Sequence, residues 1–202
     1  MLVAIDGPAG AGKSTVARAV ARALGFTYLD TGAMYRCVAL ARLRQPQGDL
    51  AALRIEVGEL VLLDGEDVTG AIREPDVTAH ASHVAADPAV RAAMVERQRA
   101  LFADGDWVAE GRDIGTVVAP AAELKIYLDA SDEERARRRA EQTGRPVDEV
   151  LAEQRDRDAR DRERAASPLH AAADAHVIDT TGLSLEEVVE RIAARAKELQ
   201  SA

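Results

Sequence analysis

Eight residues near the N-terminus have the composition of a loop that binds phosphate groups. The segment GPAGAGKS, residues 7–14, fits the pattern G-x-x-x-x-G-K-[ST] at every fixed position. Glycines let backbone N–H groups turn inward around a phosphate, and a helix that starts at the end of the loop adds positive potential. A glycine-rich structural turn is the alternative. The apolar run LVAI before the loop and the helical pattern after it favour phosphate binding.

Two side chains at the end of this loop could act on a nucleoside triphosphate. A lysine in this position reaches the β- and γ-phosphates, and the hydroxyl that follows it holds Mg²⁺. Lys13 and Ser14 occupy these two positions. We therefore expect the triphosphate to be contacted by Gly7, Pro8, Ala9, Gly10, Ala11, Gly12, Lys13, Ser14 and Thr15.

A second candidate is the charged stretch RDRDARDRERA, residues 155–165, which contains five arginines and four acids. Charge runs of this kind are usually solvated helix faces held by their own ion pairs. Arg157, Asp161 and Arg164 nevertheless have the spacing i, i+4, i+7, which places them on one face of a helix. The residues alone leave both interpretations open: a solvated helix, or a helix with one face toward a ligand.

Strands that alternate with helices predict the fold that positions these residues. Short apolar segments predict five strands, at residues 2–5, 26–30, 107–113, 124–130 and 176–179. The last helix begins at a capping box of Ser184 and Glu187. The alternation predicts an α/β fold: a five-stranded parallel sheet of the P-loop NTPase type with helices on both faces.

Two segments interrupt this alternation. Residues 54–69 alternate in polarity around two tight turns and predict a small antiparallel meander. Residues 131–165 begin with a second capping box, Ser131 and Glu134, and are almost wholly polar, as expected of an exposed helical pair that moves as a lid. We expect one domain, 1–202, with a core of 1–45, 88–130 and 166–202, an insert at about 46–87 and a lid at about 131–165.

Composition narrows the class of protein further. The chain has 202 residues, of which 47% are hydrophobic, so one domain with an ordinary core is expected. A formal net charge of -9 argues against nonspecific binding to nucleic acid. The single cysteine, Cys37, excludes an intrachain disulfide, and neither a membrane-spanning run nor a signal peptide is recognised. We expect a cytoplasmic monomer that binds neither nucleic acid nor a membrane.

Six motifs occur in a fixed order along the chain: IDGPAGAGKST, LDTGAMYR, DGEDVTGAIR, EGRDIGTVV, LDASDEERARRR and RDARDRERA. In this order they resemble bacterial cytidylate kinases, a family of P-loop nucleoside monophosphate kinases. The string GRDIGTVV and the arginine–aspartate run are the most specific of them. The resemblance implies that the γ-phosphoryl group of ATP is transferred to CMP and dCMP, with Mg²⁺, in pyrimidine nucleotide metabolism. The insert would then bind the acceptor.

The same resemblance implies roles for individual residues around the acceptor nucleotide. Thr31, Arg36, Arg112 and Arg164 would approach the CMP phosphate, and Lys13, Arg112 and Arg164 would carry catalysis. Ser82, Arg91 and Asp113 would bind cytosine, because a carboxylate accepts from the exocyclic amine while the other two donate. Arg157 and Asp161 would approach the sugar, whereas Asp158 on the same helix is expected to face solvent.

The predicted lid contains four clustered arginines, Arg135, Arg137, Arg138 and Arg139. The resemblance implies that some of them bind ATP when the lid closes, and we expect these to be among Arg135, Arg138 and Arg139. Successive residues on a helix point about 100° apart, so not all can face one site. Arg135 shares a face with Arg138 and another with Arg139, and the sequence leaves the choice open.

Two other functions are compatible with the motifs taken singly. The chain could be a P-loop kinase for another small acceptor, such as UMP or a metabolite hydroxyl. It could also be a binding module that changes shape with ATP and catalyses nothing. A GTPase is disfavoured, because no N-K-x-D sequence is present.

Overall fold

The computed structural model describes residues 1–50, 52–164 and 167–201, which fall into two compact units. Unit 1 contains residues 1–28 and 104–202, and unit 2 contains residues 29–103. Residues 51, 165, 166 and 202 lie outside the described residues, and so do the parts of the predicted core, insert and lid that fall on them.

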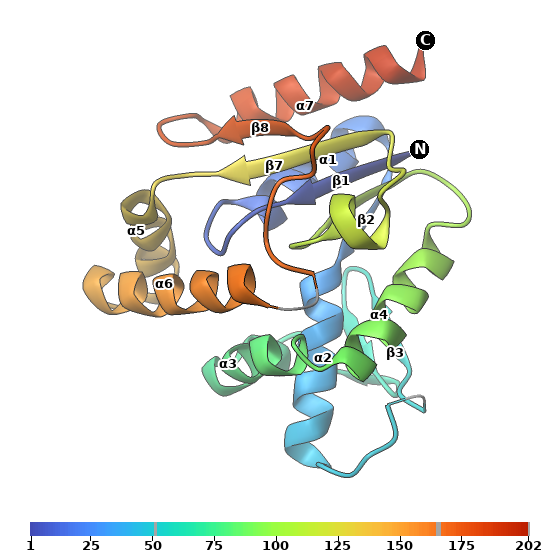
Figure 1. The fold of residues 1–202 in the computed structure, drawn as a ribbon, viewed down its shortest axis with the longest axis vertical. Helices are drawn as coiled ribbons and strands as arrows, with labels where there is room; N and C mark the ends of the chain where they lie inside the picture. Colours follow the sequence, from blue (N-terminus) through green and yellow to red (C-terminus); the bar gives the residue numbers. More distant parts are fainter. Residues whose placement is uncertain (51, 165–166, 202) are drawn as a thin grey trace. The chain divides into compact units, whose positions relative to one another are not determined.

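A five-stranded sheet with the strand order β2-β6-β1-β7-β8 organises the core (Figure 1). Its strands are β1 (Leu2–Asp6), β2 (Thr27–Asp30), β6 (Trp107–Glu110), β7 (Leu124–Asp129) and β8 (His176–Asp179). Strand β1 pairs in parallel with both β6 and β7, and β7 pairs in parallel with β8. The predicted five-stranded parallel sheet is confirmed.

One face of the sheet is covered by two helices of unit 1, α1 (Lys13–Leu24) and α7 (Leu185–Gln200). Val3 and Ile5 of β1 share a buried apolar cluster with Val20 of α1 and Ile192 of α7. These side chains follow the strand period of two and the helix period of about 3.6, which is why the sequence reveals them.

On the opposite face a short π-helix, η2 (Ile114–Val118), contacts strand β1. Neighbouring residues on a strand point to opposite faces, so Asp6 points away from the cluster that contains Ile5. Its carboxylate accepts hydrogen bonds from the N–H groups of Ile114 at 2.9 Å and Gly115 at 2.8 Å. Strand β6 ends at Glu110, earlier than the predicted residue 113, and the chain after it reaches Asp6 at Ile114 and Gly115.

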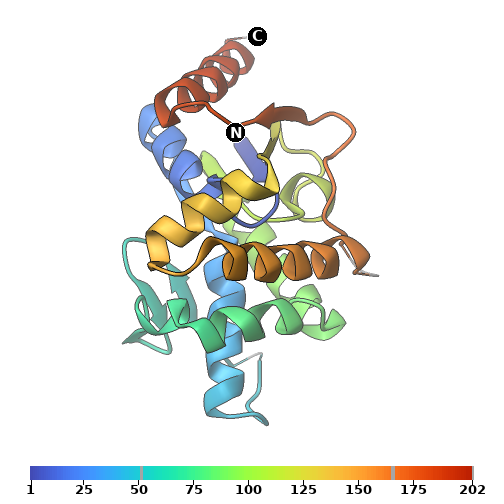
Figure 2. The ribbon, with the colours of Figure 1, turned by 90° about the vertical axis from the view of Figure 1, so that its left-hand side faces the viewer.

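The predicted lid forms a helical hairpin of α5 (Asp132–Thr143) and α6 (Val147–Glu163) within unit 1 (Figures 1 and 2). The small apolar side chains of Ala136, Ala140 and Val150 form a buried cluster of their own between these helices. The hairpin therefore has a minimal apolar core, and polar contacts must supply much of its attachment.

The two predicted capping boxes have different outcomes. Ser184 and Glu187 form the complete reciprocal pair at the start of α7. Ser131 accepts a hydrogen bond from the N–H group of Glu134 at 3.2 Å, but the Glu134 carboxylate accepts from Arg137 and Arg138 instead of reaching back. Competing arginines one turn away explain the difference.

Unit 2 contains the predicted antiparallel meander, which is confirmed. Its elements are α2 (Thr31–Arg44), β3 (Ile55–Val57), β4 (Val61–Leu63), β5 (Glu66–Asp67), η1 (Ala71–Arg73), α3 (Pro75–Val84) and α4 (Pro88–Leu101). Helix α2 packs against both α3 and α4, so this compact unit is wider than the predicted insert. In the part of the chain that the structure describes, every helix is too short or too polar to cross a bilayer.

Candidate active site

The predicted phosphate loop, residues 7–14, joins the end of β1 to the start of α1 in unit 1. A Cβ atom at Gly7 would lie 2.0 Å from the carbonyl oxygen of Leu128, so only glycine fits there. Gly12 has a φ of 87°, in the left-handed region that favours glycine, and immediately precedes α1. The loop therefore delivers the N–H groups of a helix N-terminus to whatever anion it binds.

Lys13 is the first residue of α1 and follows Gly12 directly. It is 6% exposed, and its Nζ donates to the carbonyl oxygen of Pro8 at 2.6 Å. Burial and the positive charge of Arg112 lower the pKa of Lys13 to about 7, although the carboxylate of Glu110 opposes this shift. A bound phosphate would raise the pKa again, so the amine gains charge when an anionic ligand arrives.

The residues that follow Lys13 suit a magnesium ion shared with a nucleotide. Ser14 and Thr15 are exposed on the first turn of α1. Among the residues that the structure describes, no group of three or more histidines, cysteines or acids could hold a metal by itself. Mg²⁺ commonly takes one or two protein oxygens together with phosphate oxygens and water, and the Ser14 hydroxyl fits that requirement.

Several predicted acceptor residues of unit 1 converge on Asp161 of α6. Its Oδ2 accepts from Arg112 Nε at 3.0 Å, and Oδ1 lies 3.8 Å from Arg164 Nη2. Burial alone would raise the pKa of Asp161, but Arg112, Arg164 and Arg157 together hold it below its ordinary value. Three guanidinium groups around one carboxylate leave an excess of positive charge, which suits a phosphate dianion.

Four other predicted acceptor residues belong to unit 2. Thr31 is buried at the start of α2, and Arg36 donates to Asp30 Oδ2 at 2.8 Å. Arg91 of α4 is buried, donates to a backbone carbonyl, and lies over the ring of Tyr35 at 5.6 Å. Ser82 Oγ, on α3, donates to the Ala79 carbonyl oxygen. Asp113 is buried in unit 1, directly before η2.

The four lid arginines separate into two pairs. Arg137 and Arg139 are exposed. Arg135 is 1% exposed and contacts the phosphate loop, while Nη1 of Arg138 lies 3.9 Å from where a Cβ of Gly12 would be. The i, i+3 pair of Arg135 and Arg138 therefore faces the loop.

Comparison with known proteins decides the family of this chain. A sequence profile described as cytidylate kinase matches residues 3–198. The chain belongs to the cytidylate kinase family. A cytidylate kinase from Desulfitobacterium hafniense is 52% identical over 208 residues, covering 94% of this chain and 90% of that protein. A second, from Pelotomaculum thermopropionicum, is 52% identical over 213 residues, covering 96% of this chain and 94% of that protein.

Solved structures agree with this family at the level of the fold. A gluconokinase from Sinorhizobium meliloti superposes with a TM-score of 0.53 at 18% identity, covering 99% of this chain and 94% of its own. A shikimate kinase from Acinetobacter baumannii, in complex with shikimate, gives a TM-score of 0.51 at 16% identity, covering 98% and 93%. The chain has the fold of small P-loop kinases.

One expectation about this cytidylate kinase family member is wrong. Asp158 does not face solvent: it is 1% exposed and lies 2.6 Å from Arg135 in a buried ion pair. Asp158 and Asp161 are three residues apart and so share a helix face, a signal that was present in the sequence. Because charged residues lie on every side of the C-terminal half of α6, charge patterning did not indicate which face is buried.

Sequence reasoning also missed two acids of the site, Asp6 and Glu110. Asp6 directly precedes the phosphate loop and fixes η2, and burial raises its pKa to about 6. Glu110 is buried, accepts a hydrogen bond from Tyr28, and opposes the lowering of the Lys13 pKa. An acid at the carboxyl end of a buried strand was the available signal for both.

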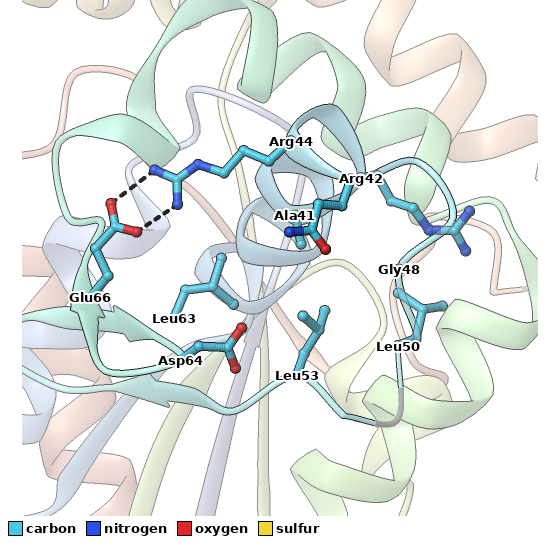
Figure 3. A pocket seen from close by; sticks show the side chains of 10 residues that line it. Ala41, Arg42, Arg44, Gly48, Leu50, Leu53, Leu63, Asp64 and Glu66 are labelled. Carbon is cyan, nitrogen blue, oxygen red and sulfur yellow. Dashed lines mark hydrogen bonds and ion pairs between the residues drawn. The ribbon is translucent and has the colours of Figure 1, made fainter.

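A separate cavity of about 190 Å³ lies within unit 2, beside the C-terminal part of α2 and the meander (Figure 3). An ion pair between Arg44 and Glu66 borders it, with Nη1 and Oε2 2.7 Å apart. Its described lining is Ala41, Arg42, Arg44, Gln45, Gly48, Leu50, Leu53, Leu63, Asp64 and Glu66. None of these residues belongs to the predicted acceptor or ATP contacts.

Proposed function

We propose that this chain transfers the γ-phosphoryl group of ATP to CMP, and also to dCMP, with Mg²⁺ bound beside the phosphate loop. Membership of the cytidylate kinase family supports the donor and the acceptor. We call Asp161 and the three arginines around it, Arg112, Arg157 and Arg164, the Asp161 cluster. The observation that carries the mechanism is that Arg112, a member of this cluster, lies close enough to Lys13 to lower its pKa. Positive groups for a donor phosphate and for an acceptor phosphate are thus neighbours.

The reaction needs no covalent intermediate, because an oxygen of the acceptor phosphate is itself the nucleophile. Its second pKa lies near about 6, so the oxygen is mostly ionised at neutral pH. Lys13 would bind the γ-phosphoryl group, while Arg112 and Arg164 would offset the acceptor's charge and align it. Ser14 would help to hold Mg²⁺, which when bound would supply further neutralisation of the triphosphate's charge.

The Asp161 cluster suits exchange of partners when the acceptor binds. Arg112 would release Asp161 and direct its guanidinium fork to the acceptor phosphate, for which it has matching geometry. Asp161 and Arg157 would then hydrogen-bond the sugar. In the same proposal Thr31 and Arg36 contact the phosphate, and Ser82, Arg91 and Asp113 bind the base.

A panel of acceptors, assayed for ADP formation, tests this proposal. We expect CMP and dCMP to support turnover and UMP to be much poorer, because the uracil carbonyl would oppose the acceptor oxygens of Asp113. Asp113→Asn offers a donor to that carbonyl and should narrow the gap between CMP and UMP. Turnover that prefers a hydroxyl acceptor, or ATP binding without any acceptor-dependent turnover, would contradict the proposal. A cytoplasmic location and a monomeric state remain predictions from the sequence.

A further inference from the structure

A buried ion pair connects the two lid helices. Arg135 of α5 and Asp158 of α6 are each 1% exposed, and Nη1 lies 2.6 Å from Oδ2. Burying two charges is costly, and a well-packed apolar pair is often as stable or more so. Stability alone therefore does not account for charges at these two positions, and their other contacts are informative.

Both partners also bind the main chain of one residue of the phosphate loop, Ala9. Arg135 Nη1 donates to the carbonyl oxygen of Ala9 at 2.6 Å, and the Ala9 N–H donates to Asp158 Oδ1 at 3.3 Å. The three groups form a closed ring of hydrogen bonds. Since the N–H and the carbonyl belong to consecutive peptide planes, the ring fixes the orientation of the loop on both sides of Ala9.

The next loop residue, Gly10, shows how closely the lid helices approach. A Cβ atom there would lie 2.7 Å from Gln154 Nε2 and 3.0 Å from the Cβ atom of Arg135. Gly10 has a φ of 78°, which also favours glycine. The base of the hairpin is therefore packed directly onto the loop backbone.

We propose that Arg135 and Asp158 are positioning residues for ATP: through Ala9 they hold the phosphate loop in the conformation that binds the triphosphate. They do not touch ATP, so Arg135 has a different role from the ATP contact expected from the sequence. These contacts with Ala9 keep the base of the lid attached to the phosphate loop. ATP binding to the loop is therefore expected to change the stability of α6. This inference rests on the proposed function only in taking ATP as the ligand of the loop.

Two variants and one control test the contact between the Arg135–Asp158 pair and Ala9. Asp158→Asn removes the charge that binds Arg135, and the double variant Arg135→Met with Asp158→Leu keeps the site filled with apolar side chains. Each should raise the KM for ATP by about tenfold or more, while the KM for CMP stays within about twofold. Glu153→Gln, on the same helix, breaks the exposed pair with Arg145 and should leave both constants unchanged.

The dissociation constant for ATP, measured by calorimetry without acceptor, separates this inference from the proposed function. It should rise in both variants even if the true acceptor is not CMP. A wild-type dissociation constant in the folded double variant, whatever its Tm, would overturn the inference, because the pair would then have no role in positioning the loop for ATP. Equal increases in the KM for ATP and for CMP would overturn it as well.

Hydrogen exchange on the wild-type chain covers the case in which the variants fail to fold. Because Ala9 is bound by α6, ATP alone should slow exchange in residues 147–163 by about tenfold or more. CMP alone should slow exchange mainly near Arg157 and Asp161, which we propose to contact its sugar, and much less in residues 147–154, the half of α6 nearer its N-terminus. Unchanged exchange of α6 with saturating ATP would refute the coupling.

Discussion

The charges around Lys13 show what the site requires of its ligands. Lys13 is buried near Arg112, and like charges with little water between them raise each other's free energy. Arg112 in turn shares Asp161 with Arg164. Anionic phosphates would offset these positive charges, so the site favours ligands that carry several negative charges.

Lys13→Ala should leave less than about a tenth of wild-type turnover, a loss of at least about 1.4 kcal/mol of transition-state stabilisation. Steady-state assays with saturating CMP and ATP measure this.

The wild type should also take up protons when ATP binds at pH 8, because the amine of Lys13 starts mostly neutral with a pKa of about 7 and gains a proton beside the phosphates. Calorimetry in buffers of different ionisation enthalpy should show that this uptake is missing in the variant. Equal uptake in both proteins would contradict the assignment.

Asp161→Ala should lower kcat/KM for CMP by about ten- to hundredfold, with little change in the KM for ATP. The physical reason is the loss of a buried acceptor for the sugar hydroxyls and of the partner that orients Arg112. Asp156→Ala is the matched control, because Asp156 is an exposed acid on the same helix. It should cost well under about 1 kcal/mol in stability and leave kinetics unchanged. Matching kinetic constants for the two variants would mean that α6 is a solvent-exposed structural helix whose Asp161 does not contact the acceptor.

At the scale of elements, the strands were predictable and the faces of the lid helices were not. LVAI of β1 is a short apolar run directly before a glycine-rich loop, and together the two favour a buried strand followed by a phosphate loop. The C-terminal half of helix α6 has charges on every side, so charge alone does not indicate which of its residues are buried, and Val150 is the one apolar residue on the buried face. Tertiary partners decide instead: Arg135 on another helix buries Asp158, and Arg112 buries Asp161.

Arg138→Ala should raise the KM for ATP by about tenfold, whereas Arg139→Ala should have almost no effect. The two residues are adjacent on α5, but Arg138 lies beside Gly12 and Arg139 is exposed. Arg138 is already held by Thr180 and Glu134, so little side-chain entropy is lost when it meets a phosphate. Initial-rate kinetics at varied ATP check this, and a larger effect from Arg139 would reverse our assignment of the inward face.

At the scale of the whole molecule, one buried acid ties the sheet to the loop that carries Arg112 and Asp113. Asp6 sits at the end of β1 and binds the first two N–H groups of η2. Its pKa is raised from 3.8 to about 6, chiefly by burial. The folded chain therefore holds this proton more tightly than the unfolded chain does, and stability depends on pH through this group.

Asp6→Asn should remove that pH dependence. In the wild type the favourable contribution is complete below pH ~4, declines as the pH rises toward about 6, and is constant above that. A shift of about two pKa units corresponds to about 3 kcal/mol. The free energy of unfolding of the wild type relative to the variant should therefore fall by that order between pH 4 and 7, measured by urea denaturation. A relative stability that is flat across this range would show that Asp6 titrates normally.

Cys37, the chain's single cysteine, lies fully buried in α2 within unit 2. Burial raises the pKa of its thiol to about 11, so both access and ionisation protect it from thiol reagents. The Cys37 thiol can therefore react only after unit 2 opens. In excess reagent the rate of labelling reports the opening of unit 2, and no engineered cysteine is needed. A nucleotide that binds residues of unit 2, as we propose for CMP, should delay the labelling. The labelling rate of Cys37 in the wild-type chain thus reports how often unit 2 opens and how far the acceptor nucleotide suppresses that opening.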